Sequence, residues 1–226
     1  LIRTAFEFAV DKRAFPGVAQ VLRELRRGPG TRSLQAPLYF VSASPPTLRG
    51  VLERKMLLDG VELDGLTLKN PVRSVRRVGL KALKRQLAYK LGALLAYRSQ
   101  LPRGARETLF GDDMESDALV YSLYADVVSG RLRGEALART LVHHKAEEEI
   151  ATAIAAFADT LPSVATVERI YIHLARTTEH GLDLASFGPW LTSVENSFQT
   201  ALVLWRDGKI SAKGTMRVAK AIRAEG

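Results

Sequence analysis

Hydrophobic and polar positions along the first half of the chain follow two alternating periods, and they predict strands separated by helices. Short apolar runs typical of buried strands occur at 37–41, 66–68, 107–110 and 125–128. Between them, apolar residues recur every three or four positions, which predicts amphipathic helices over 18–27, 47–58 and about 80–101. Strands that alternate with amphipathic helices favour an α/β fold of the Rossmann-like type, in which a parallel sheet is flanked by helices.

The pattern becomes mostly helical after Gly134. We expect one long helix over 135–159, one strand over 169–174, a helix over 194–206 and a final helix that Ser211 caps and that ends near Arg223. The sequence therefore predicts two parts. Residues 1–134 form the core with the sheet, and residues 135–226 form a mostly helical C-terminal extension packed on that core.

Composition is ordinary for a globular protein, with 46% hydrophobic and 25% charged residues among 226. The chain contains no cysteine, which excludes disulfides, thiolate metal sites and a cysteine nucleophile. No apolar run approaches the roughly 18 residues that a membrane span requires. These features fit a reducing compartment, and we expect a cytoplasmic protein.

Positive charge is concentrated in the first half of the chain. Residues 1–110 contain 21 Lys and Arg against 8 Asp and Glu, and the net charge of the whole chain is +9. No acid lies between Asp64 and Glu107, a stretch with eleven basic residues. Such a stretch attracts phosphorylated small molecules, phospholipid headgroups or an anionic membrane surface, unless it is only a solvated face. Nucleic acid is disfavoured, because few aromatic side chains lie among the charges.

The most informative stretch is ETLFGDDMESD at 107–117. An apolar strand ends at Gly111 and is followed by the carboxylates of Asp112, Asp113 and Asp117, just where a helix is expected. The carboxyl edge of a parallel sheet is where ligands bind, and grouped carboxylates suit Mg²⁺. The alternative is that these acids only complement the dipole of the following helix.

Two further features precede the acids in the chain. Ser42 follows the apolar run PLYFV, where its hydroxyl and the backbone of Ala43 can hold phosphoryl oxygens. Lys90 lies on the helix before the acid-ended strand, and its ammonium can neutralise the same group in the transition state. Either could also be an ordinary turn or surface residue. Their order and strand contexts together predict a site for phosphoryl chemistry.

The series of a strand with VSASP, then Lys90, then GDDMESD resembles motifs two, three and four of the haloacid dehalogenase superfamily. More narrowly, FPGVAQVLREL followed by PLYFVSASP resembles the catalytic domain of actin-patch-associated phosphatidate phosphatases and their bacterial relatives, over about residues 15–130. The resemblance implies a Rossmann-like core and Mg²⁺-dependent hydrolysis of a phosphomonoester through an aspartyl-phosphate. By the same resemblance Ser42 contacts phosphate, Lys90 steadies the intermediate and Asp112 ligates Mg²⁺, with Asp113 or Asp117 completing the site.

Motif one of that superfamily, the DxDxT that supplies the nucleophile, is not visible. Asp11 is the one early candidate, and Arg13 stands where the second acid would be. Either the strand that carries motif one lies upstream of Leu1, which we favour, or the chain is a non-catalytic member. We therefore expect a phosphatase of a phosphomonoester, such as a phosphatidate-like substrate, whose fragment as given is inactive. The alternative is an inactive module that binds anionic membrane or a protein partner through its basic face.

Overall fold

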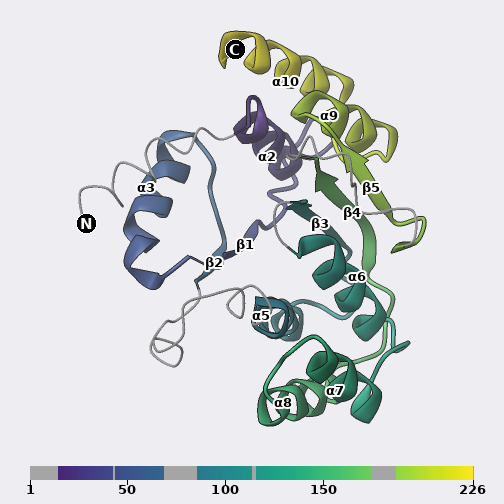
Figure 1. The fold of residues 1–226 in the computed structure, drawn as a ribbon. Coiled ribbons are helices and arrows are strands. Elements are labelled where there is room, and N and C mark those ends of the chain that lie inside the picture. The colour runs from purple at the N-terminus through teal and green to yellow at the C-terminus, as the bar shows by residue number, and fades with distance from the viewer. Residues whose placement is uncertain (1–14, 43, 69–85, 114–115, 175–186, 226) are drawn as a thin grey trace. The chain divides into compact units, whose positions relative to one another are not determined.

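A computed structural model of the protein describes residues 15–42, 44–68, 86–113, 116–174 and 187–225 (Figure 1). Its strands are β1 (Tyr39–Ser42), β2 (Gly65–Leu68), β3 (Glu107–Asp112), β4 (Val167–His173) and β5 (Leu191–Val194). Its helices are α2 (Val18–Arg27), the 3₁₀ turn η1 (Pro46–Leu48), α3 (Arg49–Leu58), α5 (Gln86–Gln100), α6 (Asp117–Val128), α7 (Gly134–His143), α8 (Glu148–Asp159), α9 (Ser197–Arg206) and α10 (Ala212–Glu225). The fold is therefore α/β, with small parallel sheets flanked by helices.

The chain divides into two compact units. Unit 1 comprises residues 1–71 and 194–226, and unit 2 comprises residues 72–193. The boundary expected from sequence, between 134 and 135, falls inside unit 2 at the start of α7. Residues 135–226 also supply β4 and β5 to the same sheet as β3, so this part of the chain is not only helical.

In unit 1, β1 and β2 pair in parallel, with Tyr39 opposite Gly65 and Ser42 opposite Leu68. Helix α2 packs against α9 and α10, which return from the far end of the sequence. An ion pair between the buried Glu24 and the partly exposed Arg217 joins α2 to α10, and the guanidinium lies 2.7 and 2.6 Å from the two carboxylate oxygens. The predicted cap of the last helix is confirmed by the Ser211 hydroxyl, which accepts a hydrogen bond from the N–H of Gly214 at 3.0 Å.

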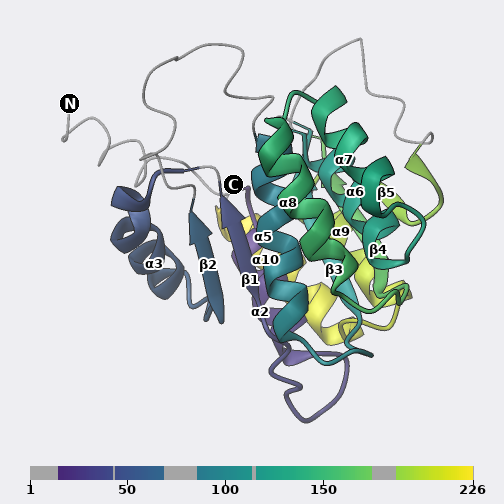
Figure 2. The ribbon, with the colours of Figure 1, turned by 90° about the horizontal axis from the view of Figure 1, so that it is seen from below.

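In unit 2 the strand order is β3-β4-β5, and β3 pairs with β4 in parallel. Helices α5, α6, α7 and α8 bury one apolar cluster, and Figure 2 shows α8 lying along α5 with α7 beside it. The cluster includes the fully buried side chains of Leu91, Val120, Tyr124, Leu137 and Ala158. Strand β3 is at one end of this sheet, so among the described residues its outer edge pairs with no strand.

A polar cluster fixes the beginning of β3. The carboxylate of Glu107 accepts hydrogen bonds from Arg98 at 2.7 Å, from the Tyr124 hydroxyl at 2.5 Å and from the Thr166 hydroxyl at 2.8 Å. Burial raises the pKa of Tyr124 far above its ordinary value, and the neighbouring Glu107 carboxylate raises it further, so the hydroxyl stays a donor. The strand that leads to the acids is thereby tied to α5, α6 and the start of β4.

The expected strands at 37–41, 66–68, 107–110 and 169–174 are confirmed, as are the helices over 18–27 and 47–58. The strand predicted at 125–128 is wrong, because these residues form the last turn of α6 and bury Val127 and Val128 in the helical core. The single helix predicted over 135–159 is also wrong. It is interrupted after α7, where Lys145 adopts a left-handed backbone conformation (φ 67°) that ends the helix.

Candidate phosphoryl-transfer site

The candidate site lies at the carboxyl end of β3. The strand ends at Asp112, opposite His173 at the end of β4, and the N–H of Asp113 donates to the carbonyl of His173 at 3.1 Å. Helix α6 begins five residues after the end of the strand, at Asp117. The structure therefore brings the three predicted acids to the sheet edge where α/β proteins bind ligands.

Lys90 reaches this edge from α5 and pairs with Asp117. Its ammonium lies 2.5 Å from the Asp117 carboxylate, and both side chains are buried. Burial raises the pKa of Asp117 above its ordinary value, although the Lys90 charge acts in the opposite direction, and the charge of Asp112 adds to the increase. The buried Lys90 ammonium is thus held near the end of β3 by the buried Asp117 carboxylate, which also lies 3.4 Å from the N–H of Asp112.

Gly111 permits this geometry. A Cβ atom at this position would lie 2.5 Å from both the Cβ and a carboxylate oxygen of Asp117. The glycine therefore lets the first turn of α6 approach the backbone of β3. The same oxygen of Asp117 lies 3.4 Å from the N–H of Asp112, so the helix start and the strand end are in direct contact.

Two neighbouring residues of this edge were not identified from the sequence. Tyr121, one turn into α6, donates its hydroxyl to the carbonyl of Phe110 at 2.9 Å and so fixes α6 against β3. His173 lies next to Asp112 because of the parallel register. A histidine at the end of a predicted strand was a usable signal, but its position beside the acids depends on the pairing of β3 with β4.

Ser42, the predicted phosphate contact, is the last residue of β1 in unit 1 and is half-buried. Its hydroxyl accepts a hydrogen bond from the N–H of Ser44 at 3.2 Å, as expected for a tight turn after a strand. Ala43, predicted to contribute its backbone, lies outside the described residues. The structure brings together Lys90 and the three acids in unit 2, and the role of Ser42 beside them stays a prediction.

The fit of Mg²⁺ to these residues can be judged from the carboxylates. In the ranges that the structure describes, no group of three or more acidic, histidine or cysteine side chains is arranged to hold a metal ion. Mg²⁺ takes only one or two carboxylates, with water and phosphate at its other positions, so the two adjacent acids at the strand end are chemically suitable, and ligation by Asp112 and Asp113 stays a prediction. Asp117 is engaged by Lys90, and metal ligation by Asp117 stays a prediction.

The basic stretch is only partly an exposed face. Residues 69–85 lie outside the described residues, and in the remainder Lys90 and Arg98 are buried in ion pairs. Arg103 and Arg106 are exposed. None of the helices in the described ranges is long and apolar enough to span a membrane.

Comparison with protein-family models, with curated proteins and with solved structures finds no match to this chain. Functional interpretation therefore depends on the residues and their geometry.

Proposed function

We propose that this chain forms part of an Mg²⁺-dependent phosphatase that hydrolyses a phosphomonoester, including a phosphatidate-like lipid. The observation that supports it best is the buried Lys90–Asp117 pair beside Asp112 and Asp113 at the carboxyl end of a parallel strand. A buried ammonium next to two carboxylates that fit a divalent cation suits a phosphoryl group, which carries negative charge on three oxygens. The Rossmann-like arrangement of the haloacid dehalogenase superfamily is part of this proposal.

Each residue has a distinct role in the proposed site. Lys90 neutralises charge that develops on the transferring phosphoryl group, and Asp117 positions the ammonium for this task. Asp112 and Asp113 would hold Mg²⁺, which supplies Lewis-acid stabilisation of the phosphoryl oxygens when bound. The resemblance implies that the Ser42 hydroxyl contacts phosphate, and this role stays a prediction.

The covalent step requires a nucleophile in addition to Asp112, Asp113 and Asp117, which have other roles in the proposal. In the superfamily that the sequence resembles, the first aspartate of motif one attacks phosphorus, and the second protonates the alcohol as it leaves. Water then hydrolyses the aspartyl-phosphate. Asp11, the early candidate, lies outside the described residues. The proposed roles of Lys90, Asp112 and Asp113 hold for any nucleophile that reaches this edge.

The test measures phosphate release from p-nitrophenyl phosphate with and without Mg²⁺, using protein in which any native residues that precede Leu1 are present. We expect Mg²⁺-dependent turnover that falls about 100-fold or more in Asp112→Asn and in Lys90→Gln. Glu135→Gln is the matched control, since its side chain is 80% exposed on α7 in the same unit. Full activity of Asp112→Asn would refute the proposed site.

The alternative function is an inactive module that binds anionic membrane or a protein partner, and the exposed Arg103 and Arg106 favour it. It predicts salt-sensitive sedimentation with phosphatidylserine vesicles and no turnover under any of the conditions above. Arg103→Gln combined with Arg106→Gln should then release the protein from vesicles. Turnover that is unaffected by this double variant would favour the phosphatase.

A further inference from the structure

Unit 1 contains a pocket of about 230 Å³ that is separate from the site of Ser42. It is lined by α2, by the loop over 33–38 and by the turn over 60–62. Leu38 immediately precedes β1, and the turn precedes β2, so the pocket lies at the amino ends of the two strands. Ser42 is at the opposite end of β1, roughly 10 Å away at the usual rise of a strand.

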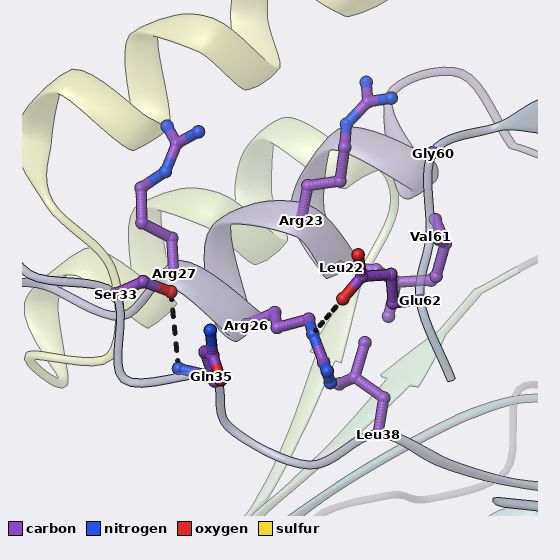
Figure 3. A pocket seen from close by; sticks show the side chains of 10 residues that line it. All are labelled: Leu22, Arg23, Arg26, Arg27, Ser33, Gln35, Leu38, Gly60, Val61 and Glu62. Atoms are coloured by element: carbon purple, nitrogen blue, oxygen red, sulfur yellow. Dashed lines mark hydrogen bonds and ion pairs between the residues drawn. The ribbon is translucent and has the colours of Figure 1, made fainter. Parts of the chain in front are cut away.

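Three arginines of α2 line this pocket, and Arg26 is already neutralised. Its guanidinium lies 2.6 Å from the carboxylate of Asp64. It also lies 3.2 Å from the carboxylate of Glu62 (Figure 3). The hydrogen bond to Asp64 raises the pKa of Arg26, so this pair persists over the whole physiological range. The Arg26 guanidinium is therefore engaged by two carboxylates and is not expected to bind an anionic ligand.

Arg23 and Arg27 are less closely paired with carboxylates than Arg26. Among the described residues Arg23 contacts no carboxylate, since its guanidinium donates to the carbonyl of Asp59 at 2.6 Å and to the Gln20 side chain at 2.7 Å. Arg27 lies 3.4 Å from Glu24, whose two carboxylate oxygens are both held more closely by Arg217. The side of the pocket formed by these two arginines is consequently positive.

The two arginines also repel each other. They are four residues apart on α2, and Figure 3 shows both side chains extending to the same side of the helix, away from Arg26. Like charges at this spacing destabilise a helix unless a counterion lies between them. Arg27 is half exposed, so its guanidinium can change rotamer at little cost to meet a ligand.

The loop beside Arg27 adds uncharged donors. The Ser33 hydroxyl accepts a hydrogen bond from the N–H of Gln35 at 3.3 Å, which leaves its own proton free to donate. Gln35 itself adopts a left-handed backbone conformation (φ 48°), which is unfavourable for a residue with a side chain. Strained residues of this kind cluster at ligand-binding positions.

We propose that this pocket binds a phosphate dianion, either free phosphate or the phosphate of a phosphomonoester, through Arg23, Arg27 and Ser33. Guanidinium groups bind phosphate oxygens through two parallel hydrogen bonds, and a dianion cancels the repulsion between the two arginines. The volume lies below the usual range for whole drug-sized ligands, so the pocket takes the phosphate group and leaves the rest of the ligand outside. This proposal does not depend on the phosphatase activity.

The test is calorimetric titration of the full chain with inorganic phosphate at constant ionic strength, with chloride as the control anion. We expect binding that weakens at least about tenfold in Arg27→Gln and in Arg23→Gln, as for loss of a charged hydrogen-bond partner. Arg206→Gln is the matched control, because this arginine is 62% exposed on α9 of the same unit. Phosphate binding that Arg27→Gln removes and Arg206→Gln retains belongs to the pocket, and it is distinct from any phosphate binding at the proposed phosphatase site.

Two arms distinguish the sources of the phosphate. Vesicles that contain phosphatidate are compared with vesicles of equal charge that contain phosphatidylserine. Phosphatidate-specific sedimentation that Arg27→Gln abolishes would assign the pocket to a lipid headgroup, and phosphate binding without sedimentation would assign it to a soluble ligand. Unchanged phosphate affinity in Arg27→Gln would overturn the proposal. Circular dichroism of each variant checks that it is folded. If Arg23→Gln is unfolded, the phosphate affinity of Arg27→Gln alone tests the proposal.

Discussion

The ammonium of Lys90 and the carboxylate of Asp117 are 2.5 Å apart, with 6% and 10% of their side chains exposed. The pair joins the first half of α5 to the first residue of α6, and a carboxylate oxygen of Asp117 lies 3.4 Å from the N–H of Asp112. A buried ion pair adds little to net stability, but the loss of one partner leaves an uncompensated charge. The pair is therefore more informative about the chemistry of the strand end than about the stability of the fold.

Removal of the Lys90 charge should destabilise unit 2. We expect Lys90→Met to cost about 3–5 kcal/mol of the free energy of unfolding, because Asp117 is left buried without a cation. The measurement is urea denaturation followed by Trp190 fluorescence in a Trp205→Phe background, since Trp190 lies in unit 2 and Trp205 in unit 1. The double variant Lys90→Met with Asp117→Asn should recover part of the loss, and equal stability of single and double variants would contradict the prediction.

The Lys90→Met variant should also be more sensitive to alkali. Burial already raises the pKa of Asp117, and loss of the cation raises it further. A carboxyl whose folded-state pKa exceeds its unfolded value of about 3.9 binds protons better when folded, so the stability of the variant is lost as the pH rises from about 4 towards the folded-state pKa. Urea midpoints of the variant at about pH 5 and about pH 8 should differ in this direction. Equal midpoints, measured relative to the wild type, would contradict it.

Gly111→Ala tests the close approach of α6 to β3. The added Cβ would lie 2.5 Å from Asp117, whose position is fixed by Lys90, so the helix start must move. We expect a loss of about 1–3 kcal/mol in the unfolding of unit 2, together with loss of Mg²⁺-dependent turnover. Gly104→Ala is the matched control, because a Cβ there has no heavy atom within 4 Å.

Unit 1 should be sensitive to acid through Glu24. Burial alone would raise the pKa of this carboxyl, but the Arg217 guanidinium outweighs burial and holds the pKa below its ordinary value. The stability that the pair contributes is present above the unfolded value of about 4.3 and is lost as the pH falls through the lower folded-state pKa. Thermal unfolding followed by Trp205 in a Trp190→Phe background should show this loss in the wild type and not in Glu24→Gln. Glu62→Gln, whose side chain is 79% exposed, should behave like the wild type.

Gly214→Ala sets helix propensity against packing. In an ordinary helix the change stabilises by about 1 kcal/mol. Here the new Cβ would lie 2.8 Å from a carboxylate oxygen of Glu24 that Arg217 also holds. We expect destabilisation in the wild type and stabilisation in a Glu24→Ala background, measured by thermal unfolding. Stabilisation in both backgrounds would show that Glu24 moves freely.

Local periodicity was sufficient for much of the fold. Val18, Val21, Leu22 and Leu25 define the face of α2, and the expected end at Gly28 agrees with its last residue, Arg27. It failed where tertiary packing decides the outcome. Val127 and Val128 favour a strand by intrinsic propensity but are buried at the end of α6. The break between α7 and α8 occurs at Lys145, which is left-handed although it is not a glycine, so the sequence did not indicate the end of the helix.

The candidate site could be predicted as a set of residues but not as a geometry. Lys90 and Asp117 were both identified, yet their ion pair depends on how α5 packs against α6. The position of His173 beside Asp112 depends on a strand register between segments about 60 residues apart. Arg23 and Arg27 belong to no motif in the sequence. Their proposed role in anion binding depends on the structure, in which Arg217 holds Glu24.

Within the described residues no strand pairs with the outer edge of β3, and this has a consequence for association. An outer strand of a sheet can accept an added strand by β-augmentation, and every position of β3 is half-buried. A parallel strand added at this edge would itself end beside Asp112. The backbone hydrogen bonds that add this strand would then also place its end at the candidate site. The completeness of the site would depend on the concentration of the protein or of the partner that supplies the strand.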